Sequence, residues 1–301
     1  MRYPGKEAEA DAQIGLDRIA AEFAPLGSPI ILFNAAHSGS SLLADALAEA
    51  GVFMGAERNP YGDATAIVPL VRQVVERHMP DVGRINDHSD PVLSAVAVAA
   101  FAEHLKGRLP GAPWGWKLGE TVFIVPLLAR LFPTARFVHV VRDGRDVAFS
   151  PFLAPKDPFW RKVHFNTDRI TSWHGLAMTQ RAYRARGPLF NAIRWVNSAS
   201  LGRAYGAMLG PRYREVRYED LVSDFATVVT GLCDWLEISA TASSAAHVHA
   251  RSVGKWRKQP RREIEAVMAI LEPTLTCFSY GDGGPVPMFR RDPLWRRLLW
   301  S

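Results

Sequence analysis

The chain has 301 residues, of which 48% are hydrophobic and 22% are charged. This balance is typical of a globular protein with a large buried core, and it excludes collagen-like and intrinsically disordered chains. The 36 Lys and Arg residues outnumber the 30 Asp and Glu residues, so the formal net charge is +6. A charge of this size suits an anionic ligand, and it suits a basic solvated surface equally well.

The sequence predicts a cytoplasmic protein without a membrane segment. Residues 1–23 carry acidic side chains and lack the apolar stretch of a secretory signal. The longest apolar stretches, such as residues 121–128, are too short to cross a bilayer. Cys233 and Cys277 are the two cysteines, and their separation fits no metal-ligand spacing. Two isolated thiols are typical of a reducing compartment, and we expect no metal.

Strands alternate with helices along the predicted chain. Strands are predicted in short apolar and β-branched runs, at residues 29–34, 114–118, 136–141 and 213–217. Helices are predicted at residues 42–50, 64–78, 92–109, 168–186, 188–209, 224–236 and 262–277, with a further apolar helix ending before Pro133. The alternation predicts an α/β fold with three layers, α/β/α, around a mostly parallel sheet. No linker-like segment divides residues 1–301, so we expect a single domain.

The first strand, loop and helix form the most informative local unit. Residues 35–41, Ala-Ala-His-Ser-Gly-Ser-Ser, are small and polar, so their backbone N–H groups can turn toward an anion at the positive end of the next helix. The hydroxyls of Ser38, Ser40 and Ser41 could donate to the same oxygens. A plain helix N-cap fits this pattern equally well. The loop lacks the lysine and the spacing of a Walker A motif, which argues against a kinase of a small metabolite.

A second phosphate-binding pattern follows the third predicted strand. Arg142 comes directly after this strand, and Ser150 lies eight residues further along. A turn and a short helix between them could bring a guanidinium and a hydroxyl to one phosphate group, and the guanidinium fork matches phosphate oxygens well. The alternative interpretation is that the charged residues between 142 and 146 form only surface ion pairs.

With these patterns the sequence resembles the sulfotransferases that use 3′-phosphoadenosine 5′-phosphosulfate (PAPS), a family with a P-loop-like fold. Ala-His-Ser-Gly-Ser-Ser-Leu-Leu at residues 36–43 is similar to the family's 5′-phosphosulfate loop, and Arg142 with Ser150 is similar to its 3′-phosphate motif. Residues 131–147 resemble the family over their whole length. The resemblance implies that six loop residues bind the phosphosulfate: His37, Ser38, Gly39, Ser40, Ser41 and Leu42.

Two further elements resemble the family toward the C-terminus. Val-Arg-Tyr-Glu-Asp-Leu at residues 216–221 is similar to the family's Tyr-Glu-Asp element, which implies that Tyr218 lies at the adenine. Arg-Ser-Val-Gly-Lys-Trp-Arg at residues 251–257 is similar to a Gly-x-Trp loop that closes over the 3′ end of the nucleotide. This implies nucleotide contacts from Arg251, Gly254, Lys255 and Trp256. The four elements stand in family order, and the resemblance covers residues 29–280.

The sequence departs from the family at residue 37, where His replaces the usual Arg or Lys. A neutral imidazole offers less positive charge but can donate one hydrogen bond, and we expect a bound phosphosulfate to raise the pKa of His37. Gly-Trp-Lys-Leu-Gly-Glu at residues 115–120 resembles the family's Trp-x-Lys-x-Pro-Glu stretch, which implies that Lys117 faces the transferring group. Lys117 could then supply the cation that residue 37 lacks. The alternative is a lysine that only reaches solvent at a strand end.

Three residues are candidates for the general base, which takes the proton from the acceptor. The resemblance implies a His, or an acid shortly after the phosphate-loop helix, where this chain has Glu57 and Asp63. Asn-Pro-Tyr-Gly-Asp at residues 59–63 favours Asp63, since relatives often carry an acid after Asn-Pro-x-Gly. Asp63 could equally be a helix N-cap before Ala64. His37 is the third candidate, because the resemblance places it beside the sulfuryl group.

The resemblance implies an enzyme that transfers a sulfuryl group from PAPS to a hydroxyl or amine of a small molecule or glycan and releases 3′-phosphoadenosine 5′-phosphate (PAP). It implies no metal and no nucleic-acid partner, and it leaves a homo-oligomer open. Two other functions stay open: a PAPS-binding protein without catalysis and a basic nucleic-acid-binding protein. The latter would use the basic residues around Trp256, namely Arg251, Lys255, Arg257, Lys258, Arg261 and Arg262.

Overall fold

The computed structural model describes residues 19–78, 91–150, 159–160, 163, 187–239 and 252–280, and every structural statement below concerns these residues. The helix predicted at residues 168–186 and the predicted nucleotide contact Arg251 lie outside them. Among the helices of these ranges, none combines the length and the apolar character needed to cross a membrane.

The centre of the fold is a sheet of four parallel strands in the order β2-β1-β3-β4. The strands are β1 (Ile30–Asn34), β2 (Gly115–Lys117), β3 (Arg136–Val141) and β4 (Tyr213–Arg217). In the register of the two central strands, Ile30 pairs with Arg136 and Asn34 pairs with Val140. The chain therefore adds β2 on one side of β1 and then adds β3 and β4 on the other side.

The central strands form because their residues can be buried on both faces. All five residues of β1 are buried, with Ile31 and Phe33 in the core on one face and Ile30 and Leu32 in the core on the other. The Phe and Val residues of β3 are buried as well. Continuous apolar runs of this kind are typical of parallel strands that helices cover on both sides.

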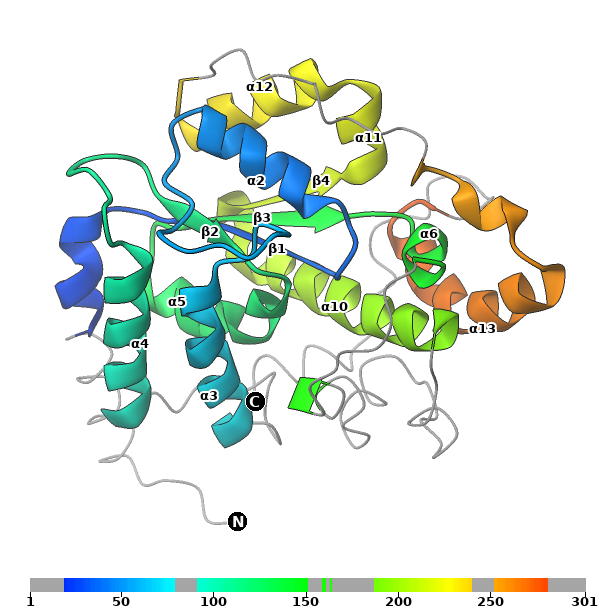
Figure 1. Cartoon of the computed structure of the whole chain (residues 1–301), viewed down its shortest axis with the longest axis horizontal. Helices are drawn as coiled ribbons and strands as arrows, with labels where there is room; N and C mark the ends of the chain where they lie inside the picture. Colours follow the sequence, from blue (N-terminus) through cyan, green and yellow to red (C-terminus); the bar gives the residue numbers. More distant parts are fainter. Residues whose placement is uncertain are drawn as a thin grey trace.

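Helices cover both faces of the sheet, so the fold has three layers (Figure 1). One face carries α2 (Ser40–Glu49), α11 (Tyr218–Ser223) and α12 (Phe225–Leu236). The opposite face carries α3 (Val68–His78), α4 (Pro91–His104), α5 (Val125–Leu131) and α10 (Pro188–Leu209), with the 3-10 helices η2 (Thr65–Ile67) and η4 (Gly119–Ile124). The predicted α/β/α architecture is confirmed.

A third group of elements lies beyond the carboxyl ends of the strands (Figure 1). It comprises α6 (Gly144–Ala148), the 3-10 helix η8 (Lys255–Lys258) and α13 (Arg261–Cys277). α6 and α13 form a core with the first half of α10, while the second half of α10 packs under the sheet. Two short 3-10 helices, η1 (Ala24–Leu26) and η5 (Gly210–Arg212), complete the described elements.

The structure corrects three details of the predicted elements. α4 ends at His104 rather than at residue 109, because Gly107 takes the left-handed conformation (φ 77) and turns the chain. The segment that resembles the family's Gly-x-Trp loop contains most of the 3-10 helix η8. α11 is absent from the predicted elements, because its six residues are too few for helical periodicity to show.

Candidate functional site

The strand order places a topological switch point between β1 and β3. From β1 the chain continues to β2 on one side, and from β3 it continues to β4 on the other. The helix after β1, α2, and the helix before β4, α10, cover opposite faces of the sheet (Figure 1). Ligands of open α/β sheets bind outside the carboxyl ends of the strands at such a point. The loops that leave β1 and β3 are the two segments in which the sequence predicts phosphate contacts.

The loop between β1 and α2 has two residues in the left-handed conformation, His37 (φ 69) and Gly39 (φ 76). They turn the backbone so that α2 begins at Ser40, where its first N–H groups have no partner within the helix. Glycine is required at residue 39, since a Cβ atom there would clash with the ring of Tyr218. The loop therefore rests directly on α11, and two of the motifs predicted to bind the nucleotide meet.

Two serine hydroxyls at this loop donate to backbone oxygens of the protein. Ser38 Oγ donates to a backbone oxygen three residues earlier at 2.7 Å, and Ser41 Oγ donates to the backbone oxygen of Tyr61 at 2.5 Å. Ser40 is buried at the first position of α2. Gly39 is the N-cap of α2 and no side chain caps the helix, so the serines do not act as caps, whereas a plain N-cap formed by the Ser-Gly turn is compatible with Gly39 at that position.

Four cationic side chains from separate parts of the chain lie close enough to His37 for their charges to act on it. Lys117 ends β2, Arg142 follows β3, Arg194 lies in α10 and Lys255 begins η8. Burial, followed by the charges of these four side chains, lowers the pKa of His37 to about 4. A bound phosphosulfate is expected to raise the pKa of His37, whereas in the protein alone the pKa is lowered. The imidazole is therefore neutral at pH 7 when no anion is bound. The potential that disfavours an imidazolium favours an anion.

Two predicted catalytic residues, Lys117 and Asp63, contact each other. Lys117 is only 5% exposed, and its Nζ lies 2.7 Å from Asp63 Oδ1 and 2.8 Å from the backbone oxygen of Tyr61. Lys117 therefore does not extend into solvent from the strand end. Asp63 is not an N-cap either, because Ala64 occupies that position of η2 and makes no side-chain hydrogen bond. Both alternative interpretations are wrong.

Arg194 and Glu120 form a second charged pair next to the first. Arg194 is buried, and its Nη2 lies 3.8 Å from Glu120 Oε1. Burial raises the pKa of Glu120, the guanidinium of Arg194 opposes this increase, and the negative charge of Asp63 adds to it. The stretch at residues 115–120 that resembles the family contains Glu120 but assigns its side chain no role, and no motif contains Arg194. The available signal was an arginine between Ile193 and Trp195, in an otherwise apolar stretch of helix.

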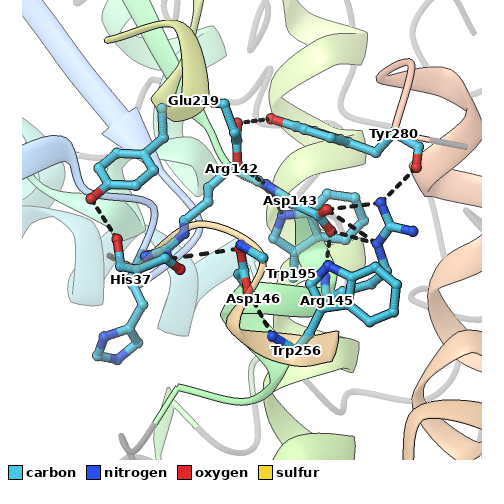
Figure 2. Close-up of polar contacts among 12 residues, drawn as sticks. His37, Arg142, Asp143, Arg145, Asp146, Trp195, Glu219, Trp256 and Tyr280 are labelled. Atoms are coloured by element: carbon cyan, nitrogen blue, oxygen red, sulfur yellow. Dashed lines mark hydrogen bonds and ion pairs between the residues drawn. The ribbon is translucent and has the colours of Figure 1, made fainter. Parts of the chain in front are cut away.

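Arg142 joins the two loops expected to enclose the nucleotide. Its Nη1 donates to the backbone oxygen of His37 at 3.3 Å, and its Nη2 donates to the backbone oxygen of Ser252 at 2.6 Å (Figure 2). Its guanidinium lies over the ring of Tyr218, 4.5 Å from the ring centre. Tyr218 Oη in turn lies 2.8 Å from Ser252 Oγ. Three of the segments that the resemblance assigns to the nucleotide therefore meet at this arginine.

Asp146 fastens the C-terminal loop to α6. Its side chain is fully buried, and its carboxylate accepts the N–H groups of Gly254 at 2.7 Å and Trp256 at 3.1 Å (Figure 2). Its Oδ2 lies 4.0 Å from Arg142 Nη2. Lys255, between the two bonded residues, is thereby held near Arg142. Burial and then the charge of Arg142 lower the pKa of Lys255, while the carboxylate of Asp146 opposes this effect.

Arg145 and Asp143 form a buried pair at the start of α6. Arg145 Nη2 lies 2.8 Å from Asp143 Oδ2 and donates to the backbone oxygen of Tyr280 at 2.8 Å (Figure 2). Its guanidinium lies 4.3 Å from a ring centre of Trp256. The interpretation that the charged residues at 142–146 form only surface ion pairs is wrong, because they are buried and connect segments distant in the sequence.

The remaining predicted site residues are less closely tied to these pairs. Ser150 is half-buried beyond the end of α6, and its backbone oxygen accepts from Asn191 Nδ2 at 3.3 Å. Leu42 packs in the first turn of α2 against the core. Glu57 is exposed, and within the described residues no contact joins its carboxylate to Lys117. Those residues also contain no group of three His, Cys, Asp or Glu side chains that could hold a metal ion.

A model of the sulfotransferase family matches residues 29–242, which is well over half of the chain. The chain therefore belongs to the sulfotransferase family, and the resemblance found in its sequence is confirmed at this level. The activity that defines this family is the transfer of a sulfuryl group.

No protein of curated function matches the chain. Among solved structures, the sulfotransferase domain from the Synechococcus PCC 7002 olefin synthase is 17% identical, with a TM-score of 0.47, over 85% of this chain and 96% of that domain. Sulfotransferase STF9 from Mycobacterium avium is 13% identical, with a TM-score of 0.45, over 93% of this chain and 86% of that protein. The assignment to the family rests on the family model.

Proposed function

We propose that this sulfotransferase transfers a sulfuryl group from PAPS to a hydroxyl or amine of a small-molecule or glycan acceptor and releases PAP. The observation that carries the proposal is the convergence of Lys117, Arg142, Arg194 and Lys255 around the loop at His37. PAPS is a polyanion with charge at both ends of its nucleoside, which cations from several elements suit. We place the reaction in the cytoplasm, where the two cysteines, neither in a disulfide, would stay reduced.

The residues at the switch point fit the two anionic ends of PAPS. The loop with Gly39 in the left-handed conformation leads into the N-terminus of α2, which suits the phosphosulfate. Arg142 stacks over Tyr218, so a 3′-phosphate at this guanidinium would leave the adenine near the tyrosine. Arg142 Nε is buried and has no hydrogen-bond partner among the described residues. Leaving such a donor unbonded is unfavourable, which supports an anion at this position.

Sulfuryl transfer requires placement of the reactants, stabilised charge on the leaving group and a base for the acceptor. The acceptor oxygen forms a bond to sulfur, the bond from sulfur to the bridging oxygen breaks, and its electron pair leaves on PAP. We assign Lys117 to the charge that develops on the leaving group, because two contacts fix its buried ammonium. The acceptor proton passes to Asp63, whose carboxylate contacts that ammonium.

Asp63 is the strongest of the three candidates for the base. It lies half-buried in direct contact with Lys117, so it stands where the lysine is proposed to act. Burial and the surrounding cations lower the pKa of His37 to about 4, so its imidazole is no stronger a proton acceptor than an ordinary carboxylate and loses the usual advantage of a histidine base. A neutral His37 still donates one hydrogen bond to an anion in the loop. Glu57 is exposed and lacks the contact to Lys117.

Substitution of the three candidates tests this assignment. With saturating PAPS and an alcohol acceptor, Asp63→Asn should lower turnover about 100-fold or more while PAP still binds, because the amide keeps the shape but accepts no proton. Glu57→Gln is the matched control and should keep wild-type turnover. An acceptor that is already ionised near neutrality should partly rescue Asp63→Asn. Full activity of Asp63→Asn, with loss in His37→Asn, would move the assignment to His37.

The same assays decide between catalysis and binding alone. Wild-type protein that binds PAP but transfers the sulfuryl group to no alcohol, phenol or amine would support a PAPS-binding protein without catalysis. Wild-type protein that releases one PAP for each sulfated acceptor would establish the transfer. The second outcome is the one that the paired Lys117 and Asp63 lead us to expect.

The contacts of Trp256 weigh against the nucleic-acid-binding alternative. Two guanidinium groups lie close to its rings, with Arg145 at 4.3 Å and Arg257 at 4.8 Å from a ring centre. Its backbone N–H donates to Asp146. The tryptophan is therefore engaged with arginines rather than presented for a base to stack on. Binding of nucleic acid that is steeply salt-dependent and indifferent to PAP would favour that alternative.

A further inference from the structure

We infer that Asn59 is a positioning residue for sulfuryl transfer, which holds Asp63 and the backbone oxygen of Tyr61 in the places where Lys117 contacts both. The inference rests on the proposed function, because Asp63 is its proposed base. Asn59 is half-buried in the segment between α2 and η2.

Residues 59–63, Asn-Pro-Tyr-Gly-Asp, form a closed turn. The Gly62 N–H donates to the Asn59 backbone oxygen at 2.8 Å, and the Asn59 N–H donates to the Asp63 backbone oxygen at 2.9 Å. Pro60 has the fixed φ that suits the second position of a turn, and Gly62 takes the left-handed conformation with φ 80. The backbone alone therefore brings the two ends of this segment together.

The side chain of Asn59 uses both of its polar atoms within the same turn. Its Oδ1 accepts the N–H groups of Tyr61 and Asp63, each at 2.9 Å, and its Nδ2 donates to Asp63 Oδ2 at 3.0 Å. These partners define which atom is oxygen and which is nitrogen, because two N–H groups need an acceptor and a carboxylate needs a donor. An aspartate here would keep the acceptor but lose the donor.

Through these contacts Asn59 orients both groups that bind the ammonium of Lys117. Asp63 directs Oδ2 to Asn59 and Oδ1 to Lys117 Nζ, at 3.0 Å and 2.7 Å. The backbone oxygen of Tyr61 accepts from Lys117 Nζ at 2.8 Å and from Ser41 Oγ at 2.5 Å. The turn thus connects the proposed base, the lysine proposed to stabilise the leaving group and the proposed phosphosulfate loop.

The charged groups around Asp63 come from three elements. Lys117 of β2 pairs with it, Glu120 of η4 carries a like charge nearby, and Arg194 of α10 pairs with Glu120. Asn59 is the neutral donor in this surrounding. A carboxylate at residue 59 would place a second negative charge 3.0 Å from Asp63 Oδ2 in place of a donor. Two carboxyl groups at such a distance favour the uptake of a proton by one of them.

Asn59→Asp tests the inference, because it keeps an acceptor for the two N–H groups and replaces only the donor. With saturating PAPS and an alcohol acceptor, kcat should rise with pH as the base at residue 63 loses its proton; this rise is the acid limb of the pH profile. In Asn59→Asp the acid limb should lie about one pH unit or more higher than in the wild type. The Kd for PAP should stay unchanged, which separates the effect from a defect in donor binding. Glu57→Gln alters an exposed acid in the same segment and should leave the profile unchanged.

A variant that exchanges the two side chains, Asn59→Asp with Asp63→Asn, provides a second test. It restores one donor and one acceptor to this contact, so its melting temperature should exceed that of Asn59→Asp. It should not regain turnover, because the carboxylate is no longer at residue 63. If Asn59→Asp does not fold, recovery of a folded protein in the exchanged variant would support the contact between residues 59 and 63. No recovery of folding or of melting temperature would overturn the inference.

Failure of the inference and failure of the proposed base give different results. An unshifted acid limb in Asn59→Asp, together with an inactive Asp63→Asn, would show that Asn59 does not act through Asp63 and would leave the base assignment in place. An active Asp63→Asn would remove the base assignment itself, and the role of Asn59 with it.

Discussion

The charged side chains at the site form two largely buried ion pairs, whose distances between nitrogen and oxygen differ. Lys117 and Asp63 are in direct contact at 2.7 Å, whereas Arg194 and Glu120 stand 3.8 Å apart. Desolvation cancels much of the attraction in such pairs, so they are weak evidence of stabilisation. Their position in a cluster that shifts the pKa values of His37 and Glu120 is more typical of a functional site.

The stability of the protein should depend on pH through His37. Burial and the surrounding cations lower its pKa to about 4 in the folded chain, below the ordinary value of 6.5. Between these values the unfolded chain binds more protons than the folded chain, so the Tm should fall as the pH decreases from 6.5 toward 4. His37→Gln should remove part of this decrease. His104 and His139, with pKa values lowered to about 4 and about 3, should account for much of the rest.

Thermal unfolding of wild type and His37→Gln, followed from neutral to acidic pH, checks this expectation. Saturating PAP should flatten the wild-type curve, because a negative charge beside the imidazole raises the pKa of His37. A His37→Gln curve that runs parallel to the wild-type curve would contradict the buried, neutral histidine.

Among the elements, the loop before α2 and the start of α11 depend on each other. Gly39 and Gly51 both have a positive φ, of 76 and 87, but a Cβ atom at residue 39 would clash with Tyr218, whereas one at residue 51 would meet nothing within 4 Å. A left-handed backbone alone costs an ordinary residue roughly 1–2 kcal/mol. Gly51→Ala should lose about that much stability, and Gly39→Ala should lose more and bind PAP more weakly.

Denaturant unfolding of the two variants, with calorimetric titration of PAP, measures the difference. Because Gly51→Ala carries the same type of backbone strain without the clash, it isolates the contribution of the packing on Tyr218. Equal losses of stability and unchanged PAP affinity would mean that the loop moves away from Tyr218 without cost.

Most elements could be predicted from the sequence because their signals are local. The strand predicted at residues 136–141 and the helix predicted at residues 188–209 coincide with β3 and α10. Lys117 and Arg142 could be placed at one site, since each stands at the end of a strand in the same parallel sheet. Arg194 could not, because its place beside the site depends on how α10 crosses the sheet.

The partners of the site residues were not readable from local patterns. Asp63 stands before a helical run and looks like an N-cap, and only the fold brings the end of β2 beside it, where Lys117 binds the carboxylate. Asp146 looks like a surface charge at the end of a strand. Its burial depends on Gly254 and Trp256, more than a hundred residues later, folding back over α6.

In the molecule as a whole, three segments far apart in the sequence meet at Arg142. They are the loop at His37, the start of α11 at Tyr218 and the segment at Ser252. A neighbouring network connects the end of α13 to them, since Tyr280 Oη donates to a carboxylate oxygen of α11 at 2.7 Å (Figure 2). A nucleotide bound at Arg142 should therefore stabilise segments from the first, middle and last parts of the described chain together.

A comparison of PAP with adenosine 5′-phosphate bears most directly on the proposed donor, because the two differ only in the 3′-phosphate. A hydrogen bond to a charged group contributes about 1.5–3 kcal/mol, so contacts from Arg142 and Ser150 should make wild-type protein bind PAP at least about 100-fold more tightly. Arg142→Ala should remove most of this difference, and Ser150→Ala less of it, because the guanidinium brings a positive charge to the phosphate whereas the serine hydroxyl is neutral.

Isothermal titration calorimetry of both nucleotides with these proteins provides the measurement. Arg261→Ala is the matched control, since Arg261 is an exposed arginine paired with Glu265 at 2.8 Å on the surface of α13, and it should leave both affinities unchanged. The predicted result is a preference for PAP that Arg142→Ala abolishes and Arg261→Ala keeps. Equal binding of the two nucleotides by wild-type protein would contradict the assignment of PAPS as the donor.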